Sequence, residues 1–304
     1  MSIIGTEAIA TTVVKTEQAI PKGRSLWQHA MLRLKRDKMA IACFAIIIFY
    51  ALIALTAKLG LIATPWDRVV GASYAPPSGD SFETWLGTDI FGRSVMYKVL
   101  HGTRIAMSVG LVTAVLSVPI GVFFGAIAGY FGGWIDEIIV WFYTTLSSIP
   151  NIMLLLAIAF AMGKGITAIY ASLVATSWVG MARVMRGEFI KHKTRDYVVA
   201  ADSLGASNFS KIFKHILPNV SHFIILNFSL QFMSAIKAEV ILSFLGLGVQ
   251  GEPSWGVMID DAKMELARGV WWQLTGATVA MFFIVLAFNI LGDALRDALD
   301  PKIK

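Results

Sequence analysis

YVVAADSLGASNFSKIFKHILPN, residues 197–219, is a polar and basic insert between two apolar runs of membrane length. Residues 166–182 precede the insert, and a second apolar run extends from Val220 to the region of Ala238. A helix needs about 20 predominantly apolar residues to cross a bilayer. The insert is too polar to lie in lipid, so we expect it in the cytosol, where it can be presented to a partner protein.

Local signals predict two helices in this insert. Residues 183–203 contain no proline and one glycine, Gly187, so the helix of the preceding span is expected to continue into the cytosol. Gly205 permits a left-handed turn, and Ser207 is a candidate cap for a second short helix. Pro218 is expected to end that second helix. The result would be a rigid knob that transmits movement.

The composition is that of a polytopic membrane protein. Hydrophobic residues make up 56% of the 304 residues, charged residues only 15%, and the mean hydropathy is +0.68. Soluble domains carry about 25% charged residues. The net charge of +6 is best explained by loops that set membrane orientation and contact anionic lipid, so no nucleic-acid partner is expected. The single cysteine, Cys43, excludes an internal disulfide.

The apolar runs predict an all-α fold with six transmembrane helices. The expected spans are residues 39–58, 105–135, 138–162, 166–182, 220–238 and 271–291, the last five forming a core over residues 105–293 that includes a cytosolic loop at about 184–219. Residues 59–104 are expected to form an outer, periplasmic loop. Residues 1–38 are expected to be a cytoplasmic tail with an amphipathic surface helix from Arg24 to Lys38, and residues 294–304 a second cytoplasmic tail.

The distribution of lysine and arginine predicts the orientation. Most of the 26 basic residues fall on one side of the membrane if the amino terminus is inside, and the outer loops hold fewer over longer polar sequence. Basic residues near the ends of spans mark the cytoplasmic side. Both termini and the basic insert are therefore predicted to be cytoplasmic.

Two features of the spans predict how the helices are shaped and packed. Gly121, Gly125 and Gly129 recur every four residues on one helical face, which allows another helix to approach closely. Glycine is also common in membrane helices without such a role. Pro150 is expected to kink the third span, because it removes a backbone hydrogen bond.

Lys237 and Glu239 are charges within an otherwise apolar span. The helical rise from Val220 places Lys237 roughly 26 Å from the inner surface, near the outer edge of the hydrocarbon. Two residues apart, the two side chains point to nearly opposite sides of the helix, so no direct ion pair is expected. Two interpretations remain open: the side chains snorkel to the outer interface, or they line a transport pathway.

The sequence carries no recognisable catalytic, nucleotide-binding or metal-binding motif. Neither a GxxxxGK[ST] phosphate loop nor a GxSxG nucleophile elbow occurs, and the five histidines are scattered. We therefore expect no enzymatic activity, no ATP hydrolysis and no bound cofactor or metal in this chain. The nearly charge-free spans also disfavour a proton-coupled secondary transporter, which would bury acidic or histidine relays.

Six segments together resemble the permease subunits of ABC importers. AADSLG (residues 200–205) and HILPN (215–219) resemble the EAA loop, the cytoplasmic coupling helix of this family. The segments LGTDIFGRS (86–94), LSFLGLG (242–248), PSWG (253–256) and LGDALRDALDP (291–301) are similar to the peptide and nickel subgroup, specifically its second, C-type subunit. The resemblance extends from Arg24 nearly to the carboxyl end.

The resemblance implies a type I importer permease of the bacterial inner membrane, with a coupling helix that docks on an ATPase. The residues that match this coupling loop are Ala200, Ala201, Asp202, Gly205, Ala206, Ser207, Leu217 and Pro218. Val199 stands at the position of the glutamate that names the motif, so that contact is lost or replaced, with Asp202 as a candidate. Glu239 matches the acidic residue before LSFLG, which favours a structural or gating role, whereas Lys237 has no such match.

The resemblance also implies partners and a substrate class. The partners would be a homologous permease subunit in a heterodimer, two ATPase subunits that carry ATP and Mg²⁺, and an extracytoplasmic substrate-binding protein. Di- or oligopeptides are the expected substrates, and nickel chelates, glutathione or antimicrobial peptides are the alternatives. A secondary transporter without an ATPase is a further alternative from a different class.

Overall fold

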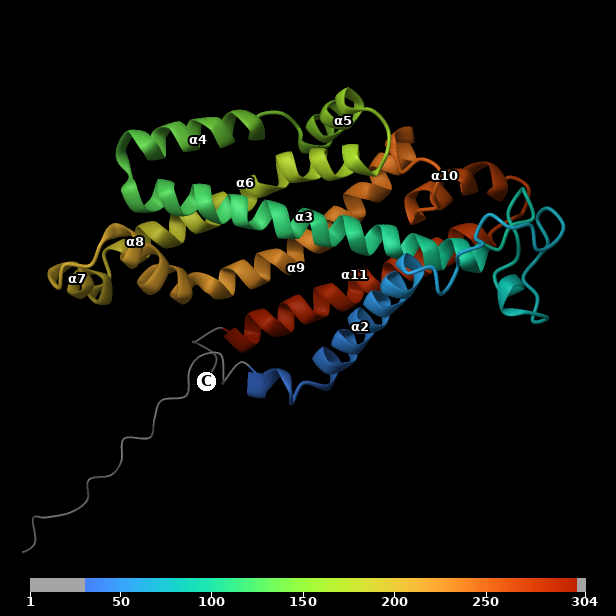
Figure 1. Ribbon diagram of the computed structural model, residues 1–304, viewed down its shortest axis with the longest axis horizontal. Coiled ribbons are helices and arrows are strands. Elements are labelled where there is room, and N and C mark those ends of the chain that lie inside the picture. The colour runs from blue at the N-terminus through green and yellow to red at the C-terminus, as the bar shows by residue number, and fades with distance from the viewer. Residues whose placement is uncertain (1–30, 300–304) are drawn as a thin grey trace, which may run out of the picture.

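The described part of the chain, residues 31–299 of a computed structural model, is built from helices laid side by side along one direction (Figure 1). These residues form no β-strand, only the isolated bridges Val69 to Arg93 and Thr88 to Ser94. The expected tail and most of the expected surface helix, residues 1–30, lie outside the described residues, as do residues 300–304.

Five helical runs within residues 31–299 are long and apolar enough to cross a membrane. They are α2 (Lys38–Lys58), α3 (Val95–Phe131), α6 (Ile166–Lys193), the continuous run Asn208–Leu247 and α11 (Trp272–Leu299). A sixth span results if α4 (Gly133–Ser147) and α5 (Asn151–Met162) are counted as one broken span. The all-α architecture with six membrane helices, expected from the sequence, is confirmed.

The third span is broken rather than merely kinked. The axes of α4 and α5 differ by 86°, and Pro150 is the residue that immediately precedes α5. Proline suits this position because its fixed φ, here −53°, starts a helix without needing an N–H donor. The break turns α5 across the bundle and opens a recess at the junction of the two helices.

Helices α3 and α6 lie parallel and in close contact along the three spaced glycines. A Cβ atom on Gly121 would lie 2.6 Å from the Cβ of Met181, and one on Gly129 would lie 2.8 Å from the Cβ of Phe189. At Gly125 the same atom would meet the carbonyl of Ala182 in α6. Only glycine allows the two backbones to approach this closely, and lipid supplies no hydrophobic force to replace that contact.

Helix α3 begins at Val95, within the stretch expected to be a loop up to residue 104. Ser94 caps its first turn, since its Oγ accepts a hydrogen bond from the Tyr97 amide at 3.2 Å. The expectation was wrong because Lys98 and His101 are polar in sequence but buried in the structure, at 5% and 6% exposure. The segment between α2 and α3 contains one short 3₁₀ turn, Phe82–Thr84.

Residues 86–94 form a folded cap over the start of α3. Asp89 accepts hydrogen bonds from the amides of Phe91 and Arg93 at 2.8 and 2.9 Å. Lys98 Nζ donates to Asp89 Oδ2 at 3.2 Å and to Gln273 Oε1 of α11 at 2.8 Å. This buried network ties the loop, α3 and α11 together.

Pro218 does not end the second helix of the basic insert, contrary to expectation. The short α8 (Asn208–Ser210), a π-helical turn at Lys211–Ile216 and α9 (Leu217–Leu242) follow one another directly, and a second π turn at Ser243–Leu247 ends the run. Pro218 lies in the first turn of α9, where proline is tolerated. The wider π turn directly before it is the place where a helix can absorb the missing N–H.

The helix α10 (Trp255–Leu266) follows at the end opposite the basic insert, and Ser254 caps it by accepting from the Val257 amide at 3.2 Å. Helix α11 then continues to Leu299, so residues 294–299 are helical rather than part of a loose tail. The side chains of Ala298 and Leu299 pack against Leu34, which explains the extension.

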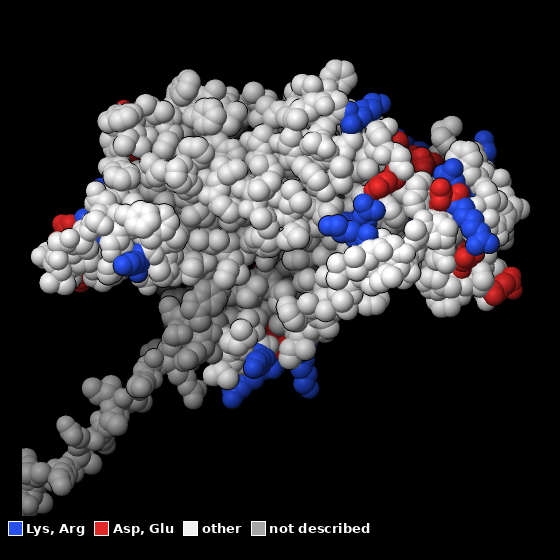
Figure 2. All heavy atoms as spheres, in the orientation of Figure 1, with Lys and Arg blue, Asp and Glu red and all other residues white. Residues whose placement is uncertain are grey.

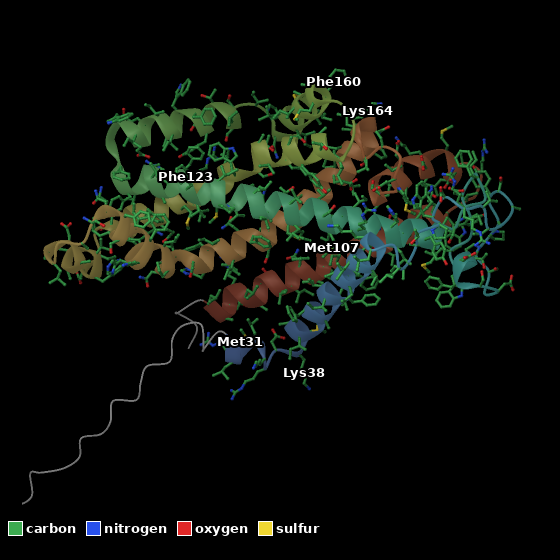
Figure 3. The ribbon with its side chains drawn as sticks, in the orientation of Figure 1. Met31, Lys38, Met107, Phe123, Phe160 and Lys164 are labelled. Carbon is green, nitrogen blue, oxygen red and sulfur yellow. The ribbon has the colours of Figure 1, made fainter. Side chains whose placement is uncertain are left out.

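Charged side chains gather at the ends of the molecule. On the face drawn in Figure 2, Lys, Arg, Asp and Glu cluster at the α10 end. Further basic and acidic atoms lie at the α7 end and beside the start of α2, and the surface between carries few charges. Exposed apolar residues such as Phe123 (57%) and Phe160 (76%) occupy this zone, where Figure 3 labels both. This arrangement suits a bilayer around the middle of the bundle.

The close contact between α3 and α6 predicts that one methyl group added at a contact glycine lowers the stability of the protein. Gly125→Ala should destabilise the protein by about 1–3 kcal/mol, because the new Cβ overlaps the α6 backbone. Gly187→Ala in α6 is the matched control, since nothing lies within 4 Å of that position and alanine favours a helix. Thermal unfolding in detergent should separate the two variants, and equal transition temperatures would contradict the close packing.

The buried network at the outer cap predicts a second large effect. Lys98→Met should cost about 3–5 kcal/mol, because it leaves the carboxylate of Asp89, 2% exposed, without its cation. Lys263→Met is the control, since Lys263 pairs with Asp260 at the surface, where such a pair contributes about 1 kcal/mol or less. Comparable losses of thermal stability in both variants would argue against a structural role for the buried pair.

Candidate functional site

The basic insert folds into a compact knob, which we define as residues 196–216. Helix α7 (Asp196–Ser203) ends in a glycine turn, in which the Gly205 amide donates to Asp202 at 2.8 Å and the Ala206 amide to Ala201 at 3.0 Å. This pair of bonds is the Schellman motif, and it needs the φ of +80° that Gly205 adopts. Ser207 then caps α8 by accepting from the Ser210 amide at 3.3 Å.

Polar contacts hold the knob rigidly against the bundle. Lys211 Nζ forms an ion pair with Asp202, which joins the π turn to α7 across the glycine turn. The Tyr130 hydroxyl, at the end of α3, donates to Asn208 Oδ1 at 2.9 Å. Ile216 is fully buried in the apolar cluster between α3, α6 and α9. A force applied to the knob is therefore passed to the helices behind it.

The outer face of the knob is apolar and exposed. Val199, Leu204, Phe209 and Phe213 are 53%, 88%, 69% and 48% exposed. The rings of Phe209 and Phe213 contact each other, with centroids 4.4 Å apart. Exposed apolar groups rimmed by polar residues mark protein interaction surfaces. Val199, at the position of the motif's glutamate, contributes an apolar rather than an acidic group to this face.

The residues expected to couple to an ATPase differ in exposure, and two of them, Leu217 and Pro218, follow the knob at the start of α9. Ala200, Asp202, Gly205, Ser207 and Pro218 are exposed, Ala206 and Leu217 are half-buried, and Ala201 is buried. Asp202 is engaged by Lys211 within the chain, so its carboxylate contributes to the rigidity of the knob. Sequence reasoning did not identify Leu204, Phe209 and Phe213, although large apolar residues that stand alone in a polar segment are a usable signal.

A groove lined by both polar and apolar side chains runs between the α4–α5 break, α6 and α9. Its larger part has a volume of about 440 Å³, and a smaller hollow of about 150 Å³ adjoins it and shares Asn151 and Ser234. Uncharged hydrogen-bonding side chains dominate its polar lining: Ser147, Asn151, Thr176, Ser177, Gln231 and Ser234. Volumes of this order suit small ligands.

The groove residues of α9 follow a simple spacing. Gln231, Ser234 and Lys237 recur every three residues, which places them on one face of the helix. Arg183 lines the other end of the groove, where its Nη2 donates to Ser147 Oγ at 2.7 Å and its guanidinium lies over the Tyr143 ring. The spacing on α9 is visible in the sequence, but nothing there identifies α5 and α6 as the opposing walls.

Lys237 and Glu239 lie on opposite sides of α9, as their spacing predicts. Lys237 is exposed and lines the smaller hollow, whereas Glu239 is 1% exposed. Glu239 Oε1 accepts a hydrogen bond from Ser243 at 2.7 Å. Ser243 in turn packs against Gly248 and Gly256, so Glu239 lies in the tight junction where α9 meets α10.

A second hollow of about 730 Å³ lies at the α10 end, under the cap of residues 86–94. Its lining contains charges of both signs: Asp89, Arg93, Lys98, Glu252, Asp260, Asp261, Lys263 and Glu265. Burial raises the pKa of the Asp261 and Glu265 carboxyls, and Lys98 opposes that shift. Among residues 31–299 no group of three acidic, histidine or cysteine side chains gathers in a way that could hold a metal ion.

The chain matches two family models. Residues 121–304 match the inner membrane component of binding-protein-dependent transport systems, and residues 25–77 match the N-terminal transmembrane domain of oligopeptide transport permease C. The first match covers the knob, the groove and α9 to α11. The second covers α2 and part of the outer loop.

Three relatives are similar over almost their whole length. The dipeptide transport system permease protein DppC of Bacillus subtilis is 39% identical, covering 92% of this chain and 87% of the relative. The oligopeptide permease protein OppC of Haemophilus influenzae is 36% identical, covering 95% and 92%. The glutathione permease protein GsiD of Pectobacterium atrosepticum is 34% identical, covering 97% of both. With its knob, its broken third span and these matches, the chain belongs to the inner membrane components of binding-protein-dependent transport systems, the permeases of ABC importers.

Proposed function

We propose that this chain forms one half of the translocation pathway of an ATP-driven importer for di- or oligopeptides. The knob is the observation that carries the proposal, since it presents an apolar, exposed face on a rigid support at one end of the bundle. The named peptide permeases among the relatives support the substrate class.

In this proposal the complex lies in the bacterial inner membrane, with both termini and the knob in the cytoplasm. A homologous permease completes the pathway, two ATPase subunits carry ATP and Mg²⁺, and a binding protein delivers substrate from outside. This chain supplies no catalytic group and binds no cofactor. Its groove faces the second permease and forms part of the pathway wall.

The continuity of the chain behind the knob gives a mechanism for coupling. ATP binding closes the two ATPases and moves the docked knobs. The run is helical from Asn208 to the end of α9 at Leu242, so displacement of the knob moves α9 and the groove residues Gln231 and Ser234 with it. The importer would thereby shift between inward-facing and outward-facing populations, driven by the difference in their affinity for ATP.

Glutathione import is the second candidate. A relative named as a glutathione permease is 34% identical over nearly the full length, and glutathione is itself a tripeptide. Uptake assays with a labelled dipeptide, a labelled pentapeptide and labelled glutathione, in cells that express the complete importer, separate the two candidates. Preferential uptake of glutathione would overturn the assignment to general peptides.

Purification of the chain at native expression levels should recover a homologous permease and ATPase subunits with a phosphate-binding loop.

The exposed apolar face of the knob predicts that one added charge weakens docking. Leu204→Glu should weaken ATPase association about 100-fold, or ~3 kcal/mol, because docking would bury an unpaired carboxylate. ATPase recovery and ATP-dependent uptake are the measurements.

Leu61→Glu is the matched control, since Leu61 is similarly exposed, at 71%, but lies in the outer loop. This variant should retain the ATPase subunits. Full ATPase recovery with Leu204→Glu would exclude this face as the docking surface. Active transport by the isolated chain would refute the importer assignment as a whole.

A further inference from the structure

The groove carries positive charge without any acidic counterpart in its own lining. Its two hollows are lined by Arg183 at one end and Lys237 at the other, and no Asp or Glu is among the residues that line them. The hollow at the α10 end differs, since its lining includes five carboxylates. The charge of the groove therefore favours an anionic group.

The two cations of the groove differ in how they are held. Arg183 already interacts with Ser147 and with the Tyr143 ring. Lys237 has no hydrogen-bond or ion-pair partner among residues 31–299, and Glu239, its closest acidic neighbour in sequence, points to the other side of α9. Near the edge of the hydrocarbon, where its position in α9 places Lys237, a lysine keeps its charge by meeting water or an opposite charge. Lys237 is the cation that is available to a ligand.

We propose that Lys237 binds the terminal carboxylate of the peptide as it passes through the groove. This inference rests on the proposed function and adds a specific recognition site to it. Every unmodified di- or oligopeptide carries one such carboxylate whatever its side chains, so a single lysine serves all of them. A hydrogen bond between two charged groups is roughly twice as strong as a neutral one.

The neighbours of Lys237 suit the adjoining part of a peptide. Asn151 and Ser234 line the same hollow and continue into the larger one, where Gln231 and Thr176 add further donors and acceptors. The amide of Asn151 offers both a donor and an acceptor to a peptide bond, and the Ser234 hydroxyl does the same. Uncharged groups of this kind contact the backbone without selecting for side chains.

A carboxylate from the second permease is the alternative partner for Lys237. The position of the side chain favours the substrate, because Lys237 lines a hollow that shares Asn151 and Ser234 with the larger part of the groove. A partner side chain that reached Lys237 would also block the connection between the two hollows. The two possibilities differ in their effect on subunit association.

The test uses the complete importer and two forms of one peptide, with a free carboxylate and with a C-terminal amide. Saturating ATP-dependent uptake of both is measured for the wild type, Lys237→Gln, Lys237→Arg and Lys237→Glu. The ratio of the two uptake rates is compared across variants, so that any preference of the binding protein cancels. Lys237→Gln should lower the ratio of free acid to amide roughly tenfold. Lys237→Arg should restore most of it, and Lys237→Glu should lower it further.

Lys164→Gln is the matched control, because it removes one exposed lysine from the connection between α5 and α6, outside the groove (Figure 3). Its ratio should equal that of the wild type. An unchanged ratio in Lys237→Gln would overturn the proposal, and loss of the second permease on purification would assign Lys237 to the subunit interface instead. Absence of uptake of either peptide by the wild-type importer would instead refute the proposed function.

Discussion

The close approach of α3 and α6 fixes the two helices that lead to opposite ends of the bundle. At Gly121, Gly125 and Gly129 the two backbones are separated by less than a side chain would need. The start of α3 carries the buried Lys98 network, and the end of α6 leads directly into the knob. Because the contact holds α3 against α6, it also fixes the position of the cap of residues 86–94, at the start of α3, relative to the knob, which follows α6.

Helix α9 provides the second element that connects the two ends. It is flanked by π turns, at Lys211–Ile216 next to the knob and at Ser243–Leu247 next to α10. Gly246, with a φ of +80°, ends the regular helix within the second turn. Such wide turns often occur at functional sites. The α-helical segment between them bears the groove residues Gln231, Ser234 and Lys237.

The features that the sequence revealed are those with a local cause. Gly205 and Ser207 form the turn and cap that their residue types favour, and glycines at a spacing of four lie on one face of any helix. The errors arose where distant residues decide. Lys98 is polar, so the sequence alone favours a loop, and only the contact with the distant Gln273 explains its burial in a helix. Pro218 is compatible with either the end or the first turn of a helix. The residues of α5 and α6 that line the groove were not predicted, because the spacing of residues within one helix does not show which other helices pack against it.

If the groove forms part of the pathway, as proposed, its polar groups suit the transport of many different peptides. Side chains vary among substrates, whereas amide groups and termini do not, so a pathway that serves many sequences gains most by contacting the invariant parts. Neutral donors and acceptors such as Asn151 and Ser234 do this without strong binding. A single cation then suffices to engage one terminus, because a wall with many charges would hold its substrate too tightly to release it. The groove, with two cations and no carboxylate in its lining, differs in this respect from the hollow at the α10 end, whose lining carries charges of both signs.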